Sequence, residues 1–464
     1  MKGEPALLKK NSSVELEIND ITNLGFGVGK IDGQVIFVSH TVPGDKVLAK
    51  IIKITSSYAV GKLEKLILPS EKRCGARCEN KLCRACPYKN LSYEDELSLK
   101  KENVEAIFKK AGLSEIKIMD TKASPLPTHY RNKAQYPVAK DKNGEYVIGF
   151  YAPKTHRVIP AIDCPLAKRG FSEVLNTLKS IFEKTKISVY DEKTGTGLLR
   201  HIYLRANDDL SELILALVIN GKTLTGEEIF KKDLSEKHPE IKGFLINTNT
   251  ENTNVILGEA WRLIYGRDYI VDTLAGVKLE ISAPSFYQVN HASCELIYEM
   301  ARELADLKKS DTLLDLYCGL GSIGLSMAKD CRELIGIEIV ADAVMHAERN
   351  AKLNGIDNAS FYASDAKESE KILEAAERER GEKIIPDVVI LDPPRAGSDK
   401  ALNEFIASLA PRKIVYVSCN PTTLARDLAQ FKPLGYTTNV VYPVDMFPLT
   451  GHVESVVCLE RREL

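Results

Sequence analysis

The sequence has little of what usually marks a nucleic-acid-binding or a membrane protein. Its 63 lysine and arginine residues are balanced by 64 aspartate and glutamate residues, which leaves a net charge of −1 and no global excess of positive charge for phosphates. It also lacks an apolar run of about 18 residues and a basic, apolar signal segment. We therefore expect a soluble, cytoplasmic monomer without membrane contact, in which any phosphate-binding surface is a local patch.

Cysteine, by contrast, is abundant. The chain has 10 cysteines among 464 residues, although a chain of this length can bury several cores without disulfides. The cytoplasm is reducing, so clustered cysteines are better explained as metal ligands or catalytic thiols. Four of them form the pattern Cys74-x₃-Cys78-x₄-Cys83-x₂-Cys86. This spacing leaves open a zinc site made by these four thiols alone.

The hydrophobic pattern divides the chain into three predicted domains, residues 1–68, 69–280 and 281–464. Short strands separated by glycine turns predict a small barrel in the first. Mixed strands and helices, including a helix over 93–111, predict an α+β domain in the second. In the third, helices alternate with apolar strands at 312–316, 333–337, 387–391 and 413–417, which predicts a parallel sheet covered on both faces.

A glycine-rich turn follows the first of these apolar strands. The segment Tyr317-Cys-Gly-Leu-Gly-Ser-Ile-Gly324 has the Gly-x-Gly-x-x-Gly spacing of nucleotide-binding loops. This spacing fits either NAD or S-adenosylmethionine, and so does Glu338 at the end of the next strand, because a carboxylate suits a ribose diol. Asp315 favours S-adenosylmethionine, since a carboxylate there opposes the pyrophosphate of NAD and suits the cationic amino-acid end of methionine.

Acidic residues also follow the third and fourth strands, as Asp365 and as Asp392-Pro-Pro-Arg395. Helix capping or a rigid turn explains each acid taken singly. Capping gives no reason why four strand ends on the ligand side should all be acidic. Arg395 occupies the position at which methyltransferases of amino groups carry an aromatic residue, so methylation of an exocyclic amine is disfavoured.

A cysteine and a glutamate near the C-terminus suggest covalent chemistry. Cys419 follows the strand over 413–417. A single thiol is commonly a buried structural residue, but uracil poses a problem that a thiolate solves: carbon 5 attacks a methyl sulfonium only after a nucleophile has added to carbon 6. A carboxylate must then take the proton from carbon 5. Glu454 is the candidate for that base.

These motifs resemble, over nearly the whole chain, those of the bacterial uracil-5 RNA methyltransferases. The matching motifs occur in the order of that family: Ser285-Phe-Tyr-Gln-Val-Asn290, Asp392-Pro-Pro-Arg395, Ser418-Cys-Asn-Pro421, and Phe447-Pro448 with His452-Val-Glu454. The resemblance implies that Cys419 is the nucleophile and Glu454 the proton acceptor. It also implies that S-adenosylmethionine is bound by Gln288, Tyr317, Glu338 and Asp392. Ser322 stands where the family commonly has asparagine and is left out of the site.

The resemblance further implies a multidomain α/β fold. Its parts would be an N-terminal TRAM domain, which is an RNA-binding barrel of the oligonucleotide-binding type, an α+β central domain with an iron-sulfur cluster, and a C-terminal Rossmann-like methyltransferase domain. The ligands of the [4Fe-4S] cluster would be Cys78, Cys83, Cys86 and the distant Cys164, which precedes a proline. Arg84-Ala85 replaces the glycines that the family favours, and Cys74 is either a substitute ligand or a bystander.

The chemistry requires the target base to leave its stack. Phe286 is a candidate to stack on a displaced base, with an ordinary core aromatic as the alternative. The segment Arg131-Asn-Lys133 resembles one that faces RNA in the family, with a solvated charged turn as the alternative. The leading hypothesis is methylation of 23S rRNA, because the barrel and the cysteines resemble the ribosomal branch. A tRNA target, an NAD-dependent oxidoreductase and an RNA-binding factor without activity are the alternatives.

Overall fold

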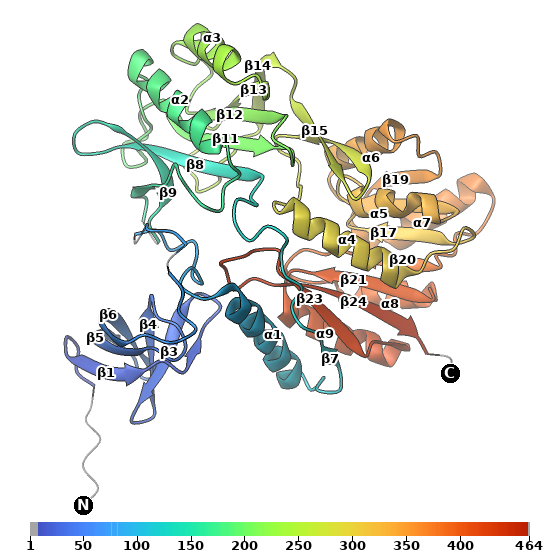
Figure 1. Ribbon diagram of the computed structural model, residues 1–464. Helices are drawn as coiled ribbons and strands as arrows, with labels where there is room; N and C mark the ends of the chain where they lie inside the picture. Colours follow the sequence, from blue (N-terminus) through green and yellow to red (C-terminus); the bar gives the residue numbers. More distant parts are fainter. Residues whose placement is uncertain (1–7, 76, 81, 154, 463–464) are drawn as a thin grey trace, which may run out of the picture.

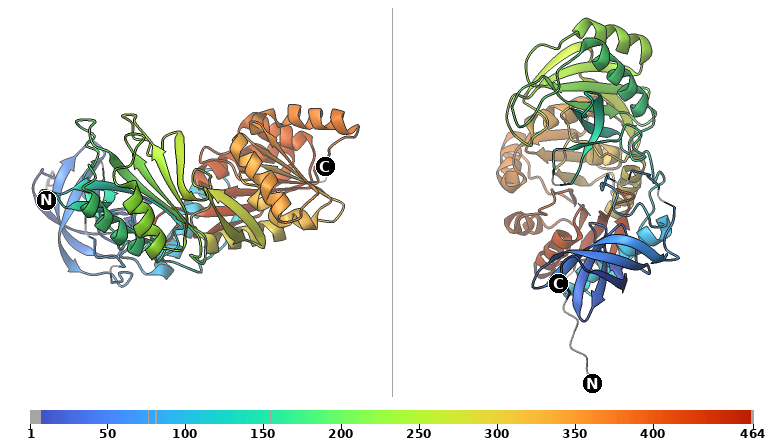
Figure 2. Two further views of the ribbon diagram at one scale, coloured as in Figure 1. Left: turned by 90° about the horizontal axis from the view of Figure 1, so that it is seen from above. Right: turned by 90° about the vertical axis from the view of Figure 1, so that its left-hand side faces the viewer.

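The computed structural model describes residues 8–462 apart from 76, 81 and 154. Its strands form three large sheets and one two-stranded ribbon. In Figure 1 the N-terminal sheet lies at the lower left, the central sheet at the top and the C-terminal sheet at the right. Seen from above, the N-terminal and C-terminal sheets lie at opposite ends of the molecule (Figure 2). No helix in the described part of the chain has the length and apolar character needed to cross a membrane.

The N-terminal sheet closes on itself. Its strand order is β1-β5-β6-β4-β3-β2, so β1 and β2 are the two edges, yet β1 ends at Glu17 and β2 begins at Asp20. Because both edges are one nearly continuous segment, the sheet forms the barrel that the sequence predicts. Alternate residues such as Ile36 and Val38 fill its interior. The strands are β1 Ser13–Glu17, β2 Asp20–Ile21, β3 Phe26–Ile31, β4 Gln34–Ser39, β5 Lys46–Ile54 and β6 Tyr58–Leu68.

The central sheet has seven strands in the order β10-β9-β8-β11-β12-β13-β14. Helices α2 and α3 pack on it, and their apolar residues share a core with the inner strands, whose side chains are buried along their whole length. The elements are β8 Lys133–Lys140, β9 Tyr146–Tyr151, β10 Val158–Pro160, α2 Phe171–Thr185, β11 Leu199–Ala206, β12 Leu213–Ile219, α3 Glu227–Lys237, β13 Ile241–Thr248 and β14 Ala260–Gly266. The ribbon β15 Tyr269–Leu274 and β16 Val277–Ser282 follows and packs on the C-terminal domain.

The C-terminal sheet runs β19-β18-β17-β20-β21-β24-β23-β7. Strands β17 to β21 are mutually parallel, and β24 pairs antiparallel with β21. The strands are β17 Thr312–Leu316, β18 Glu333–Glu338, β19 Ala359–Ala363, β20 Val388–Leu391, β21 Lys413–Ser418, β22 Tyr436–Thr437, β23 Val440–Val444 and β24 Glu454–Arg461. This doubly covered sheet agrees with the sequence pattern of continuous apolar strands.

Helices cover both faces of this sheet. Helices α4 His291–Ala305, α5 Ser322–Met327 and α6 Ala341–Leu353 share one core with it. Helices α1 Tyr93–Lys110, α7 Ser369–Arg380, α8 Lys400–Ser408 and α9 Pro421–Phe431 share the other. Successive strand residues alternate between the cores, so that Leu313 faces the first and Leu314 the second.

Helix α1 and the short strand β7 Lys117–Ile118 precede the central sheet in sequence but belong to the C-terminal sheet in space. Helix α1 packs beside α9, and β7 pairs parallel with β23. Val104 and Phe108 of α1 are fully buried there. The sequence pattern predicts 69–280 as one unit and does not reveal that α1 and β7 join the C-terminal sheet. The reason is that an amphipathic helix does not specify which apolar surface it will cover.

Candidate active site

Three of the four candidate cofactor residues, together with Cys419, meet at one edge of the C-terminal sheet. Leu316 of β17 is paired with Ile337 of β18 and with Leu391 of β20, and Leu391 is paired with Tyr416 of β21. The residues that follow these strands therefore share the edge at the carboxyl ends of the strands, where ligands bind in sheets of this kind. These residues are Tyr317, Glu338, Asp392 and Cys419.

The glycine loop after β17 needs its glycines for two reasons. Gly319 and Gly321 have φ angles of 55° and 75°, and Tyr317 itself lies in the left-handed region at 65°. Gly324 instead allows a close approach, because its backbone N–H donates to Asp315 Oδ2 over 3.0 Å. An added Cβ on Gly324 would lie 2.7 Å from the same oxygen. Asp315 is thus placed behind the loop, where it fixes the loop's path.

Glu338 links two turns at the same edge. Its Oε2 accepts from the N–H of Gly319 over 3.1 Å and its Oε1 from the N–H of Val340 over 2.9 Å. The next two side chains, Ile339 and Val340, are 64% and 53% exposed. Exposed apolar groups beside a carboxylate that suits a ribose form a surface for a flat ring. This pair was not predicted from the sequence, although two apolar residues directly after an acidic strand end could have indicated it.

The side chain of Asp365 is hydrogen-bonded to a backbone N–H two residues further along the chain. Its Oδ1 accepts from the N–H of Lys367 over 3.0 Å, which caps a short 3₁₀ helix. The capping alternative therefore describes this residue correctly. Ser322, left out of the predicted site, contacts Tyr298 through its hydroxyl at 2.6 Å.

Some side chains of the motif 285–290 are hydrogen-bonded within the fold, whereas Phe286 is exposed. The Tyr287 hydroxyl donates to Asp272 Oδ2 over 2.8 Å, and Asn290 caps α4 by accepting from the N–H of Ser293. Phe286 is 71% exposed, so it is not a core aromatic. The carbonyl of Gln288 accepts from Asn132 Nδ2 over 2.9 Å. This contact brings the segment 131–133 beside the motif.

The antiparallel pairing of β21 with β24 brings Cys419 and Glu454 together. Ser418 is paired with Ser455, so the residue after Ser418 and the residue before Ser455 lie side by side at the sheet edge. Cys419 is half-buried, and Glu454 is only 5% exposed. The two side chains of the predicted covalent chemistry are therefore neighbours, although 35 positions separate them in the sequence.

The turn after Cys419 is connected to the Asp392-Pro-Pro-Arg395 loop. Asn420 caps α9 by accepting from the N–H of Thr422 over 3.1 Å, and its Nδ2 donates to the carbonyl of Arg395 over 3.1 Å. Cys419 thus directly precedes the N-terminal cap of an 11-residue helix. The positive end of the helix dipole favours the anionic form of a thiol at this position.

Burial and like charge dominate the electrostatics of this edge. Burial, with the Asp392 carboxylate adding to it and Arg395 opposing it, raises the pKa of Glu454 to about 8. Burial, with Glu454 and Asp392 adding to it and Arg395 opposing it, raises the pKa of Cys419 to about 11. Burial also raises the pKa of Asp392 to about 7 and that of Asp315 to about 8. Such an edge attracts a cationic ligand.

The predicted cluster ligands lie in one neighbourhood. Cys86 is buried and packs with Cys164 beside Tyr130 and Leu166. Burial raises the pKa of the Cys86 thiol, and the thiolates of Cys164, Cys83 and Cys78 raise it further. Cys74 points elsewhere, donating to the carbonyl of Leu91 over 2.9 Å. Among the described residues, however, no three histidine, cysteine or acidic side chains converge closely enough to hold a metal ion.

Comparison with family models assigns most of the chain. The model described as tRNA (Uracil-5-)-methyltransferase matches residues 92–462, and the TRAM domain model matches residues 8–63. The chain belongs to the tRNA (uracil-5-)-methyltransferase family. The resemblance of the sequence motifs is thereby confirmed. The protein is accordingly an S-adenosylmethionine-dependent RNA uracil-5-methyltransferase, so the glycine loop does not belong to an NAD-dependent oxidoreductase.

Relatives over the full length carry consistent names. A protein of Halalkalibacterium halodurans named as an RNA methyltransferase is 36% identical over 99% of both chains. One of Listeria monocytogenes is 39% identical over 98% of this chain and 99% of its own. Among solved structures, the tRNA (uracil-54, C5)-methyltransferase of Pyrococcus abyssi in complex with S-adenosyl-L-homocysteine is 26% identical, with a TM-score of 0.75 over 96% of this chain and 100% of that one.

Proposed function

We propose that this methyltransferase modifies carbon 5 of a uridine in 23S rRNA through a covalent intermediate on Cys419, with Glu454 as the proton acceptor. The observation that carries the proposal is the pairing of β21 with β24, which sets the thiol beside a buried carboxylate. Both lie at the edge that also bears the glycine loop. The adjacency of the thiol and the carboxylate disfavours an RNA-binding factor without activity, which would have no use for this pair.

The proposed reaction consists of an addition to carbon 6, a methyl transfer to carbon 5, and an elimination that restores the double bond. The Cys419 thiolate adds to carbon 6 of uracil, and the electron pair moves to make carbon 5 nucleophilic. S-adenosylmethionine, when bound, would supply an electrophilic methyl group: the carbon 5–methyl bond forms as the methyl–sulfur bond breaks, and the electron pair of that bond stays on the sulfur of S-adenosylhomocysteine. Glu454 then removes the carbon-5 proton, the carbon 5–carbon 6 double bond returns, and the sulfur–carbon bond breaks to release the thiolate.

In the free protein both Cys419 and Glu454 hold a proton at neutral pH, and each must lose it before it acts. With a pKa of about 11, Cys419 is a thiol at neutral pH and must lose its proton before it attacks. Arg395 and the N-terminus of α9 favour the thiolate. With a pKa of about 8, Glu454 is largely protonated at neutral pH, and it must be ionised when it takes the proton from carbon 5.

Cofactor contacts are proposed for Gln288, Tyr317, Glu338 and Asp392. Glu338 would accept from the ribose hydroxyls, and Ile339 with Val340 would cover the adenine. Asp392, whose pKa burial raises to about 7, would face the cationic part of the ligand. The acidic groups at this edge suit a sulfonium donor, because the positive charge of the donor compensates them.

RNA contact is supported by two features besides the TRAM domain. Phe286, 71% exposed, is free to stack on a displaced base. Arg131 and Lys133 lie beside the Phe286 motif through the contacts of Asn132. Burial and the positive charges of Arg205 and Arg131 lower the pKa of Lys133 to about 8, and an RNA phosphate beside it would favour its charged form.

A tRNA target is the second candidate, and a specific observation favours it. The Pyrococcus abyssi structure that covers 96% of this chain belongs to an enzyme named for tRNA. The 23S rRNA target rests instead on the barrel combined with the cysteine-rich segment. The two candidates share the same chemistry and differ only in the RNA.

A [4Fe-4S] cluster held by Cys78, Cys83, Cys86 and Cys164 is also proposed. Its support is the mutual proximity of these thiols, of which Cys86 and Cys164 share one apolar cluster. Among the described residues no three such side chains lie close enough to hold a metal ion, so the support is the common neighbourhood of these cysteines and not a formed site. The cluster would be structural, because methyl transfer to uracil needs no electron.

Removal of the nucleophile tests the covalent scheme. Cys419→Ala should reduce turnover by at least about 10³-fold, because no other group can add to carbon 6. Wild-type protein mixed with RNA containing 5-fluorouridine should form an adduct that survives a denaturing gel, since fluorine cannot leave as a proton does. Cys458→Ala, in the same pair of strands, should keep the adduct. An active Cys419→Ala protein would disprove the scheme.

Replacement of Glu454 should block the reaction after the covalent adduct has formed. Glu454→Gln should retain adduct formation on ordinary RNA but release 5-methyluridine about 10²- to 10⁴-fold more slowly, because the proton on carbon 5 has no acceptor. Rapid-quench gels measure both steps. In the wild-type protein the rate of 5-methyluridine release from the adduct should rise with pH until Glu454 is ionised, near pH 8. Normal release by the glutamine variant would exclude Glu454 as the base.

The RNA target is tested by mapping 5-methyluridine in cells with and without the gene. If 23S rRNA is the substrate, one or more 5-methyluridines should disappear from it in the deletion strain and return with the wild-type gene but not with Cys419→Ala. Loss confined to tRNA would establish the second candidate instead.

Anaerobic purification tests the cluster. The protein should be brown and contain about four irons per chain, and Cys164→Ala should lose colour and iron while Cys74→Ala keeps them. A colourless protein that contains zinc would contradict the iron-sulfur assignment.

A further inference from the structure

A buried ion cluster lies beneath the loop that joins β23 to β24. Lys100 of α1 donates to Glu96 Oε1 over 2.9 Å and to Asp445 Oδ1 over 2.6 Å. The side chains of Lys100, Glu96 and Asp445 are 1%, 0% and 0% exposed. Such a cluster is costly to bury and is weak evidence for stability, but it can specify one conformation.

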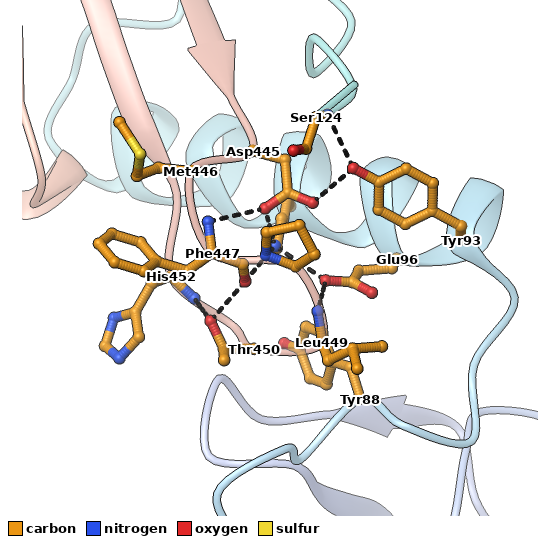
Figure 3. Close-up of polar contacts among 12 residues, drawn as sticks. Tyr88, Tyr93, Glu96, Ser124, Asp445, Met446, Phe447, Leu449, Thr450 and His452 are labelled. Atoms are coloured by element: carbon orange, nitrogen blue, oxygen red, sulfur yellow. Dashed lines mark hydrogen bonds and ion pairs between the residues drawn. The ribbon is translucent and has the colours of Figure 1, made fainter. Parts of the chain in front are cut away.

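The contacts of this cluster are directed to one loop. Lys100 also donates to the carbonyl of Phe447 over 3.2 Å, and Glu96 Oε1 accepts from the N–H of Leu449 over 2.7 Å. Asp445 accepts from the N–H of Phe447 through Oδ1 over 3.1 Å. Figure 3 shows the carboxylates of Asp445 and Glu96 bonded to backbone N–H groups of this loop, those of Phe447 and Leu449.

The loop is held in a conformation that it would not adopt alone. Leu449 has a φ angle of 69°, which is a left-handed backbone conformation that is unfavourable for a residue other than glycine. Its N–H is bonded to Glu96 and its carbonyl accepts from the N–H of Tyr88 over 3.1 Å. From the other side, Tyr93 donates to Asp445 Oδ2 over 2.9 Å and accepts from the N–H of Ser124 over 2.8 Å, as Figure 3 shows.

The loop leads directly to the proposed base. Residues 445–453 connect β23 to β24, and Glu454 is the first residue of β24, paired with Val444. Asp445 is the residue after Val444. A shift at Asp445 or Phe447 therefore displaces the strand end that carries the Glu454 carboxylate, whereas Cys419 is carried by β21 and α9 and does not depend on this loop.

We propose that Lys100 is a positioning residue, which through Asp445 and the backbone of the 445–453 loop holds Glu454 where it can take the carbon-5 proton. The inference rests on the proposed role of Glu454. It assigns α1, which comes from the predicted central segment, a part in the second half of the reaction. The cluster also explains why a lysine and two acids are buried where an apolar contact would be less costly.

The test separates adduct formation from adduct release. Lys100→Met removes the charge but keeps the length of the side chain. With the transcript that the wild-type protein methylates, release of 5-methyluridine should fall about 10- to 100-fold, because small displacements of a catalytic group cost that much, and the protein-RNA adduct should accumulate. With the 5-fluorouridine form of that transcript, the adduct should form near the wild-type rate.

Lys101→Met is the matched control. Lys101 is the next residue of the same helix, but it is 31% exposed and pairs with the exposed Asp120 over 2.8 Å. Its replacement should leave both steps unchanged. Thermal melting and binding of S-adenosylmethionine establish that each variant is folded. If Lys100→Met fails to fold, Asp445→Asn, which has the same shape without the charge, should show the same accumulation of adduct.

The outcomes distinguish the inference from the function on which it rests. A folded Lys100→Met or Asp445→Asn protein that releases product normally, or that slows both steps equally, would overturn the positioning role alone. A wild-type protein that forms no adduct with 5-fluorouridine RNA would overturn both.

Discussion

The backbone pairing between β21 and β24 is the constraint on which the chemistry depends. A thiol and a carboxylate far apart in the sequence become neighbours only because Ser418 is paired with Ser455. An antiparallel last strand beside a parallel one makes this possible, since it brings the start of β24 to the edge where β21 ends. A register shift of one residue would turn Glu454 to the other face of the sheet.

Electrostatic strain at this edge follows from the same arrangement. Asp315, Asp392 and Glu454 are gathered in a region that offers little solvation, and their pKa values rise as a result. A cationic donor relieves this strain when it binds, and it loses its positive charge when the methyl group leaves.

The molecule supports the reactive edge from parts of the chain that lie outside the C-terminal domain. Helix α1 reaches it through the ion cluster, and Asn132 holds the motif that bears Phe286 and Gln288. Gly451 lies so close to Asn23 of the barrel that an added Cβ would be 2.4 Å from its carbonyl oxygen. The loop before Glu454 is thus a meeting point of the barrel, the cysteine-rich segment and the methyltransferase sheet.

The sequence by itself determined four strands of the C-terminal sheet, β17, β18, β20 and β21, to within about a residue, because a continuously apolar strand followed by a glycine or acidic turn is typical of a buried parallel sheet. It also supplied the family, through motifs whose residue types the chemistry requires. Only the tertiary structure decided that Phe286 is exposed, that Asp365 is a cap, and that Ile339 and Val340 lie open beside Glu338. It alone showed that α1 and β7 join a distant sheet and that Lys100 is buried between two acids. These features depend on long-range packing, and a local pattern of residues carries no information about which distant surface will cover it.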